Sequence, residues 1–351
     1  MVGVSRQNIA GRLAFSKSNF WNALFFWSMS AAKNRAFLRL ARRKVKKGKR
    51  GKVLWLAILV ITFLTACRGD SVVGSDAGRQ PATAKKEVTD DLGRTITIPV
   101  KITRVVSLAP NLTENIFAVG AGDRLVGVTT FCNYPEQAKQ IAKIGDTMNP
   151  NLERIVAIKP DVVFVSTASQ IENFTRTLDD NGIAVFVTNP DSLDGVMKNL
   201  RQLGEMFGTV DQAEKLTAEL RRRVDNITQK VASEKRFRAF VQISKEPLFT
   251  IGKQSFLTAM LETSGAESTT ADVETAYPKL SKETALALNP DVIILSESDD
   301  NREPNEVFKN SPAVKNRHVI SVNADLLSRP GPRLVDALEQ IAEALGRFRN
   351  N

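Results

Sequence analysis

The sequence predicts an α/β protein of two lobes, each with a central, mainly parallel sheet flanked by helices, joined by one long rigid helix. Two observations lead to this prediction. Short apolar segments alternate with helical segments on both sides of an amphipathic stretch at 211–233, and such alternation is typical of parallel α/β sheets. A twelve-residue segment also occurs in similar form in each half, which indicates that the lobes share one plan.

The chain begins with a basic leader. Residues 1–66 hold 14 of the 49 Lys and Arg residues and none of the 38 Asp and Glu residues. From Cys67 onward, 35 basic and 38 acidic residues remain, a net charge of −3. A protein that binds nucleic acid carries its positive charge on the folded domain. We therefore expect no nucleic-acid partner.

The end of the leader has the features of an export signal. A basic run up to Lys52 precedes an apolar stretch at 53–64, followed by Thr65-Ala66-Cys67. Twelve residues are too few to span a bilayer but suit a secretory signal. The segment resembles the bacterial lipoprotein signal, whose cysteine is acylated. A short uncleaved anchor is the alternative, and Met1 and Met29 are both candidate starts. Either way, the rest is expected outside the cytoplasm, at the periplasm or cell surface.

We accordingly expect cleavage after residue 66 and lipidation of Cys67. Residues 67–87 are rich in Gly, Ser, Ala and charged side chains, a composition typical of a flexible tether. Cys132 is the only other cysteine. With Cys67 acylated, Cys132 has no disulfide partner, so the hydrophobic core must hold the fold.

The amino-terminal lobe is expected at 88–209. Apolar and polar residues alternate along 88–100 on both sides of Asp91-Leu92-Gly93, as in a β-hairpin. Strands and helices then follow in turn, with strands at 104–108, 125–128, 162–165 and 184–187, and helices at 113–119, 152–158 and 171–181.

A linking helix is expected at 210–234. No Gly or Pro interrupts it. Its apolar residues recur at spacings of three and four, at Ala213, Leu216, Leu220, Val224, Ile227 and Val231. A helix of this length would act as a rod rather than a hinge, although a domain helix packed on one sheet is the alternative. The carboxy-terminal lobe is expected at 235–348, with strands at 239–243, 292–295 and 319–322 and a helix at 255–264.

The repeated segment occupies 152–163 and 282–293. In both copies a glutamate, Glu153 or Glu283, lies seven residues before a Pro-Asp pair that opens an apolar strand. The proline ends the preceding helix. The helix dipole favours an anion in the first turn, which is a purely structural explanation. Two lobes built alike would, however, present these carboxylates at equivalent places, where a two-fold symmetric partner with two arginines could bind both.

Residues for catalysis are scarce. The single histidine, His318, excludes a multi-histidine metal site. Cys132 has no evident base, and no Ser-His-Asp set can be assembled with confidence. Gly120-Ala121-Gly122 ends a predicted helix rather than opening one, so it is not a phosphate-binding loop. We expect no enzymatic activity, no metal and no cofactor.

Short motifs recur in a characteristic order and spacing over roughly residues 88–346, at 107–114, 120–128, 134–135, 149–153, 159–161, 252–255 and 329–333. In this order and spacing they resemble the iron-siderophore/cobalamin class of ABC-importer binding proteins. It implies a monomer that holds its ligand in a cleft between two lobes and delivers it to an ABC permease and its ATPase. In this class two glutamates dock onto permease arginines, and Glu153 and Glu283 stand at those positions.

The resemblance also implies residues that contact the ligand. Cobalamin-binding members pack aromatic side chains on the corrin ring, and Phe131 and Tyr277 occupy two such positions. Asp325 and Arg329 match polar positions that could bond the corrin side-chain amides. Two other positions of the pattern are not aromatic here, namely Thr147 and Ile243.

Other ligands stay open. A trianionic ferric siderophore would favour several basic groups, of which Arg329 and Arg333 are evident. Haem-binding relatives often offer a Tyr or His ligand, and Tyr134 or Tyr277 could serve, although both could also pack beside a proline. We rank a corrinoid first, a ferric siderophore second, and haem or another chelate third.

Two rival functions belong to other classes. An enzyme on a similar scaffold would need a metal cluster or a base. A structural surface lipoprotein would gain no thermal stability from a ligand, whereas a binding protein would.

Overall fold

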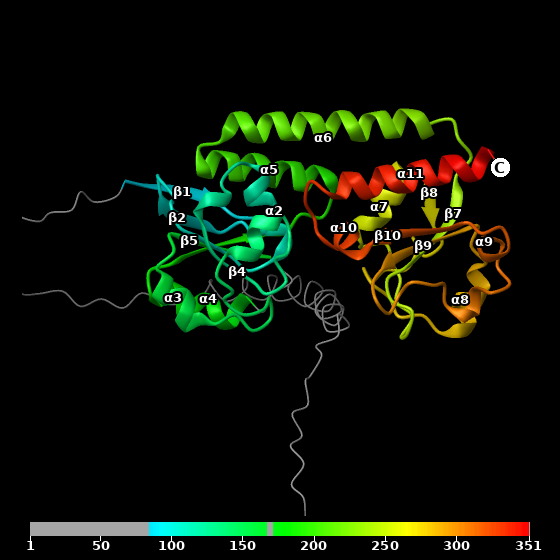
Figure 1. Ribbon diagram of the computed structural model, residues 1–351, viewed down its shortest axis with the longest axis horizontal. Helices are drawn as coiled ribbons and strands as arrows, with labels where there is room; N and C mark the ends of the chain where they lie inside the picture. The colour runs from blue at the N-terminus through cyan, green and yellow to red at the C-terminus, as the bar shows by residue number, and fades with distance from the viewer. Residues whose placement is uncertain (1–83, 167–170, 351) are drawn as a thin grey trace, which may run out of the picture.

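The computed structural model describes residues 84–166 and 171–350 and contains two α/β lobes (Figure 1). The longest helix, α6 (Val210–Val231), runs along one side of both lobes. The predicted leader, Cys67 and the tether up to residue 83 lie outside the described residues.

The amino-terminal lobe contains one hairpin and one parallel sheet. The hairpin pairs β1 (Lys85–Thr89) with β2 (Thr95–Pro99), so regular structure starts three residues before the expected boundary at 88. The sheet has the strand order β4-β3-β5-β6 and consists of β3 (Val105–Ser107), β4 (Leu125–Val128), β5 (Val162–Ser166) and β6 (Ala184–Thr188). Helices at both faces bury these strands, which explains their continuous valine-rich sequences. The helices are α2 (Pro110–Ala118), α3 (Leu152–Ile158), α4 (Ile171–Asp180) and α5 (Leu193–Phe207), with short 3-10 turns η1 (Gly122–Arg124) and η2 (Glu136–Gln140).

The carboxy-terminal lobe repeats this plan. Its parallel sheet has the order β10-β9-β7-β8, which is the order of the first sheet when β7 is matched to β3 and β9 to β5. The strands are β7 (Phe237–Gln242), β8 (Ala266–Ser268), β9 (Val292–Glu297) and β10 (Val319–Asn323). The helices are α7 (Phe256–Thr263), α8 (Lys282–Leu288), α9 (Pro312–Lys315), α10 (Ala324–Ser328) and α11 (Leu334–Asn350), with the 3-10 turn η3 (Glu306–Phe308).

Helix α6 is tied to both lobes. The predicted apolar positions lie in its packed face, where Leu220 and Val224 are buried and Leu216 is partly buried. On the polar side, Arg221 pairs with Asp194 of α5 in the first lobe. Arg223 pairs with Asp336 and Glu339 on α11 of the second lobe. Because side chains near the middle of α6 pair with both lobes, α6 is a packed strut between them.

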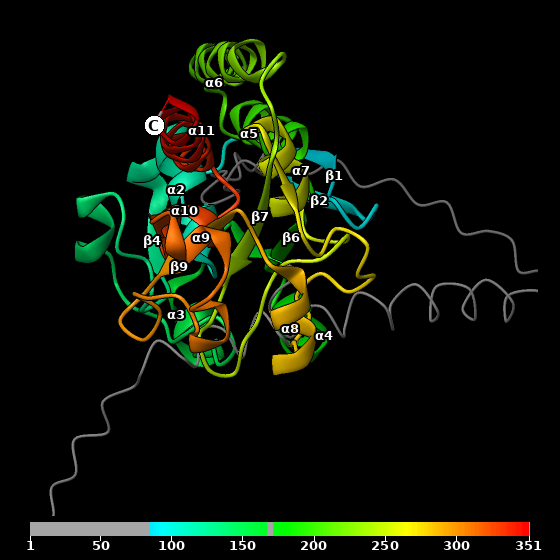
Figure 2. The same ribbon diagram turned by 90° about the vertical axis from the view of Figure 1, so that its right-hand side faces the viewer.

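The two lobes also share one hydrophobic core. A single cluster of buried side chains includes Phe186 on β6, Leu220 on α6 and Leu338 on α11. Smaller clusters lie on the other face of each sheet, around Val163 and Phe240 respectively. The continuity runs through the helical layer of α5, α6 and α11 (Figure 2). The lobes are therefore two sheets that share a common helical layer.

Candidate functional site

The repeated glutamates start two equivalent helices. Glu153 is in the first turn of α3, where the Asn151 side chain accepts a hydrogen bond from the Arg154 amide. Glu283 is in the first turn of α8, where Ser281 caps the Thr284 amide in the same way. Both helices lie at the ends of their lobes that are remote from α6 (Figures 1 and 2). The repeat thus presents two carboxylates on one side of the molecule.

The two copies share more than the predicted segment. Asp161 accepts hydrogen bonds from the backbone of Arg104, and the Arg104 guanidinium in turn donates to the Ile158 carbonyl at the end of α3. In the second lobe Asp291 and Arg238 make the matching contacts, with the Leu288 carbonyl at the end of α8. Both helices end in a left-handed residue, at φ 52° and φ 41°. These arginines went unnoticed in the sequence because they lie 54 and 50 residues before the carbonyls that they cap.

Both glutamate side chains are available to a partner. Each is exposed. For Glu283, its own backbone amide and the Ser281 hydroxyl donate hydrogen bonds that lower the carboxyl pKa. Glu283 is therefore an anion at neutral pH.

Four of the five predicted ligand residues, namely Phe131, Tyr134, Asp325 and Arg329, come from segments that follow the edge strands β4 and β10. These segments meet across the lobes, where the Asn133 side-chain amide donates to Asp325 Oδ2 at 3.2 Å. Phe131 and Tyr134 follow β4 and are 39% and 46% exposed, unusually high values for large apolar side chains in this protein. Carboxyl ends of parallel strands are where α/β proteins bind ligands. The two exposed aromatic side chains follow such a strand end.

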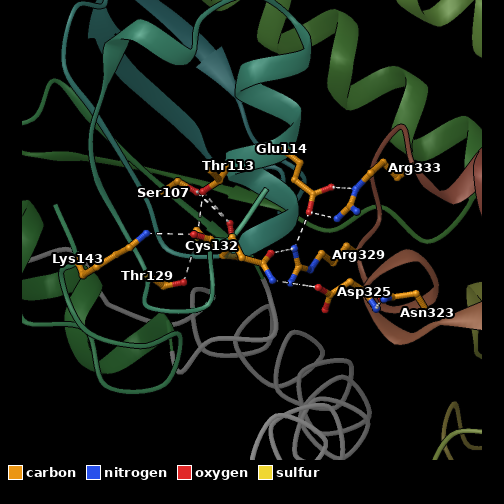
Figure 3. A network of polar contacts seen from close by, with 12 residues as sticks. Ser107, Thr113, Glu114, Thr129, Cys132, Lys143, Asn323, Asp325, Arg329 and Arg333 are labelled. Atoms are coloured by element: carbon orange, nitrogen blue, oxygen red, sulfur yellow. Dashed lines mark hydrogen bonds and ion pairs between the residues drawn. The ribbon is translucent and has the colours of Figure 1, made fainter. Parts of the chain in front are cut away.

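Arg329 and Arg333 meet a buried carboxylate of the other lobe. Glu114, on α2, is 4% exposed and accepts from Arg329 Nη1 at 2.7 Å and from Arg333 Nε at 2.8 Å and Nη2 at 2.6 Å (Figure 3). Arg329 is 5% exposed and also pairs with Asp325 at 2.8 Å. The arginine expected to bind amides of the ligand is therefore engaged with protein carboxylates on two sides.

Close backbone contact accompanies this ion-pair cluster. The Asn115 amide donates to the Pro330 carbonyl at 3.4 Å. A Cβ at Gly331 would lie 2.7 Å from Asn115 Oδ1, so glycine permits the loop before α11 to approach α2. The buried Arg329 Nε has no hydrogen-bond partner among the described residues.

Arg333 links the cluster to the exposed aromatic side chains. Its guanidinium lies 4.0 Å from the centre of the Tyr134 ring, a cation–π geometry. Partial burial works against its charge, but the hydrogen bonds to Glu114 and the charges of Glu114 and Asp325 outweigh burial and raise its pKa. Arg333 therefore keeps its positive charge and holds the Tyr134 ring.

Tyr277 is buried rather than exposed. It is 6% exposed and belongs to the shared core. Burial raises its pKa to about 12, against a hydrogen bond with Ser255 that lowers it. Tyr277 is thus a neutral phenol at physiological pH, and the structure does not bring it together with Phe131 in an exposed pair. The two positions that lack aromatic residues, Thr147 and Ile243, are also buried.

Cys132 and His318 have structural surroundings. The Cys132 thiol is buried between the hydroxyls of Thr113 and Thr129, at 3.1 and 3.2 Å (Figure 3). His318 stacks on Phe348 with ring centres 4.4 Å apart. In these contacts the thiol lies between two hydroxyl groups and the imidazole lies against an aromatic ring.

Sequence reasoning missed Glu114 as a site residue. The available signal was a glutamate at a position that packs inward, between Leu112 and Ile116 on a short apolar helix. A buried carboxylate needs a cation, and the two arginines that pair with Glu114 lie 215 and 219 residues later in the chain.

The described residues contain neither a membrane-spanning helix nor a cluster of metal ligands. Across 84–166 and 171–350, no helix has both the length and the apolar character needed to cross a bilayer. Within the same ranges, no three His, Cys, Asp or Glu side chains cluster in a way that could hold a metal ion.

Comparison with known proteins identifies the family. The model of the periplasmic binding protein family matches residues 105–326. The Bacillus subtilis ABC transporter substrate-binding lipoprotein YvrC is 31% identical over 303 residues, 83% of this chain and 96% of its own. The chain therefore belongs to the periplasmic binding protein family, in its iron-siderophore/cobalamin class, and is a substrate-binding protein of an ABC importer. Members of this family bind their ligand outside the cytoplasm and work with an ABC permease and its ATPase.

Solved structures share the fold. The periplasmic vitamin B12 binding protein BtuF of Vibrio cholerae superposes with a TM-score of 0.62 at 28% identity, over 71% of this chain and 99% of its own. A possible iron-binding protein from Staphylococcus epidermidis gives a TM-score of 0.60 at 29% identity, over 70% and 99%. The predicted two-lobed α/β class is thus confirmed.

Proposed function

We propose that this protein captures a corrinoid outside the cytoplasm and delivers it to its ABC permease, without enzymatic activity of its own. The observation that carries the proposal is the exposed pair Phe131 and Tyr134 at the meeting of the lobes. A corrin is a large, mostly apolar macrocycle, and aromatic side chains gain both buried area and ring contacts by packing on it. The similarity to a vitamin B12 binding protein supports the same ligand.

Polar groups beside the aromatic pair fit the periphery of a corrinoid. Asn133 is exposed, and Asp325 is partly exposed between Asn133 and Arg329. An amide and a carboxylate together can accept from and donate to the side-chain amides of a corrin. Arg329 then positions the Asp325 carboxylate through their ion pair. Tyr277 has a structural role in the core.

A ferric siderophore or haem is the alternative ligand. Against an anionic siderophore, Arg329 and Arg333 both already pair with Glu114. Against haem ligation by Tyr277, its pKa of about 12 disfavours the phenolate that would bind ferric iron. Tyr134, which is exposed, is the tyrosine left for that role.

The remaining parts of the proposal concern the membrane. We propose that residues 1–66 are removed, that Cys67 is acylated and that the segment up to about residue 87 tethers a monomeric binding domain. Glu153 on the 88–209 lobe and Glu283 on the 235–348 lobe then dock onto permease arginines, with 210–234 as the strut between them. Replacement of Cys67 by Ser would abolish labelling of the protein by a radioactive fatty acid.

The ligand can be identified by its colour. The chain from Arg68 onward is mixed separately with cyanocobalamin, a ferric hydroxamate and haemin, desalted, and measured by visible absorbance and thermal melting. This segment contains no tryptophan, so retained chromophore replaces fluorescence quenching as the readout. A stoichiometric corrin spectrum with a raised melting temperature supports the proposal. Retention of only haemin or the hydroxamate contradicts it.

A matched pair of variants locates the site. Phe131→Ala removes an exposed side chain of the proposed site, and Leu92→Ala removes one of similar exposure from the hairpin turn. Cyanocobalamin affinity should fall about tenfold or more in the first variant and stay unchanged in the second. Equal affinities in the two variants would place the ligand elsewhere.

A further inference from the structure

The cluster between the lobes is balanced in charge. It contains two carboxylates, Glu114 and Asp325, and two guanidiniums, Arg329 and Arg333 (Figure 3). Both oxygens of Glu114 are used by the two arginines of the other lobe. Lys143, the remaining cation in this view, donates to the backbone carbonyls of Cys132 and Ala138 instead.

The balance depends on one residue. Asp325 pairs with Arg329 within the second lobe, so Glu114 supplies the charge that offsets Arg333. The pair is largely withdrawn from water, since Glu114 is buried and Arg333 is mostly buried. Charges in such a place are poorly screened by salt. Loss of the Glu114 charge would therefore leave a net positive charge beside the exposed aromatic side chains.

We infer that Glu114 is a specificity-determining residue, which makes the site select uncharged ligands by cancelling the charge of Arg333. The inference rests on the proposed function, because it assumes that the ligand contacts Phe131 and Tyr134. Arg333 lies over the Tyr134 ring, so a ligand on that ring lies close to its guanidinium. An anionic ferric chelate at this place would find no uncompensated positive charge in the cluster to bind it. A neutral corrinoid does not require such a charge.

A purely structural role for Glu114 makes a different prediction. The same ion pairs join α2 to the loop before α11, next to the contact of Asn115 with Pro330. If Glu114 served only as an interlobe tie, its loss would lower stability and weaken every ligand alike. The ratio of two affinities separates these roles.

The experiment varies the net charge of the cluster at nearly constant shape. Glu114→Gln leaves a net charge of about +1, Arg333→Gln about −1, and the double variant restores balance. Each protein, from Arg68 onward, is titrated with cyanocobalamin and with the trianionic iron(III) tris-catecholate complex at low salt. The ratio of chelate to corrinoid affinity should rise about tenfold in Glu114→Gln, fall in Arg333→Gln and return near the wild-type value in the double variant.

Each result decides the inference. A ratio that stays constant across the four proteins overturns it, as does a wild type that prefers the tris-catecholate complex. If wild-type protein binds neither ligand, the proposed function fails, and the inference then rests on whether Glu114→Gln gains chelate binding. Absence of that gain overturns it. The double variant lacks the ion pairs of Glu114 with both Arg329 and Arg333, and its melting curve shows whether folding is preserved.

Discussion

The paired carboxylates on α3 and α8 allow a quantitative prediction for transport. The perturbation is Glu153→Gln and Glu283→Gln, singly and together. Each side chain is exposed, so its replacement costs the fold mainly the interaction with the helix dipole, about 0.3–1 kcal/mol. At position 283 the glutamine oxygen can still accept the hydrogen bonds from the backbone amide and Ser281. A close carboxylate–arginine pair across an interface contributes about 1.5 kcal/mol, which is roughly tenfold in docking affinity.

The two contributions should add. The glutamates lie on separate helices of separate lobes and share no partner in the described contacts, and independent sites are additive within a few tenths of a kcal/mol. The double variant should therefore dock roughly 100-fold more weakly. Neither helix carries a residue of the cluster around Glu114, so corrinoid affinity should stay at the wild-type value.

The assay is uptake of radiolabelled cyanocobalamin by cells in which each variant replaces the native protein. Asp211→Asn is the matched control, because Asp211 is an exposed acidic residue in the first turn of α6, remote from α3 and α8. Uptake should fall at limiting ligand in both single variants, further in the double variant, and not in the control. A double variant that transports at the wild-type rate refutes the reasoning, and so does an equal loss in the control.

Three further predictions concern stability. Arg223→Gln should lower the free energy of unfolding in urea by about 1–2 kcal/mol, because Arg223 makes hydrogen bonds of 2.6–2.9 Å to Asp336 and Glu339; an unchanged midpoint would show that α11 holds α6 by apolar contacts alone. The hydrogen bond from Arg223 lowers the pKa of Glu339, so the stability that Glu339 contributes is present above its unfolded pKa of about 4.3 and is lost as the pH falls through its lower folded pKa. Glu339→Gln should therefore have a smaller difference in melting temperature between pH 7 and pH 3 than the wild type. An identical difference in the two proteins would contradict this. Gly252→Ala should destabilise by about 2–3 kcal/mol, because its Cβ would lie 2.0 Å from the Thr275 carbonyl oxygen and 2.6 Å from that of Val273, whereas Gly346→Ala on α11, with nothing within 4 Å, should leave the melting temperature unchanged or slightly higher.

Much of the fold could be predicted because its signals are local. The strand 125–128 and the helix 152–158 have the predicted bounds, since each is a short apolar run between turn residues. Helix α5 was not predicted, although Ser192 caps its start and Gly208 ends it in a left-handed conformation. Its Gly195 and Gly204 interrupt the sequence pattern, and only the structure shows why. A Cβ at Gly204 would lie 2.5 Å from that of Ala213 on α6, so this glycine allows the two helices to pack closely.

The site was less accessible to sequence reasoning because it depends on distant pairing. The exposure of Phe131 and the burial of Tyr277 are set by the packing of their lobes, and both residues stand beside similar polar and proline neighbours in the sequence. Arg329 reads as a free cation until Glu114, 215 residues earlier, is placed next to it. Glu153 and Glu283 were found because they repeat, and a repeat is visible in one sequence.

The shared core has a consequence for how this protein denatures. Two lobes with separate cores would melt as independent units, but here Phe186, Leu220 and Leu338 lie in one buried cluster that crosses from the first sheet through α6 to α11. Neither half can lose its packing without uncovering apolar surface on the other. Chemical denaturation should accordingly be a single cooperative transition, and a gene fragment that encodes one lobe should yield insoluble polypeptide rather than a smaller folded unit.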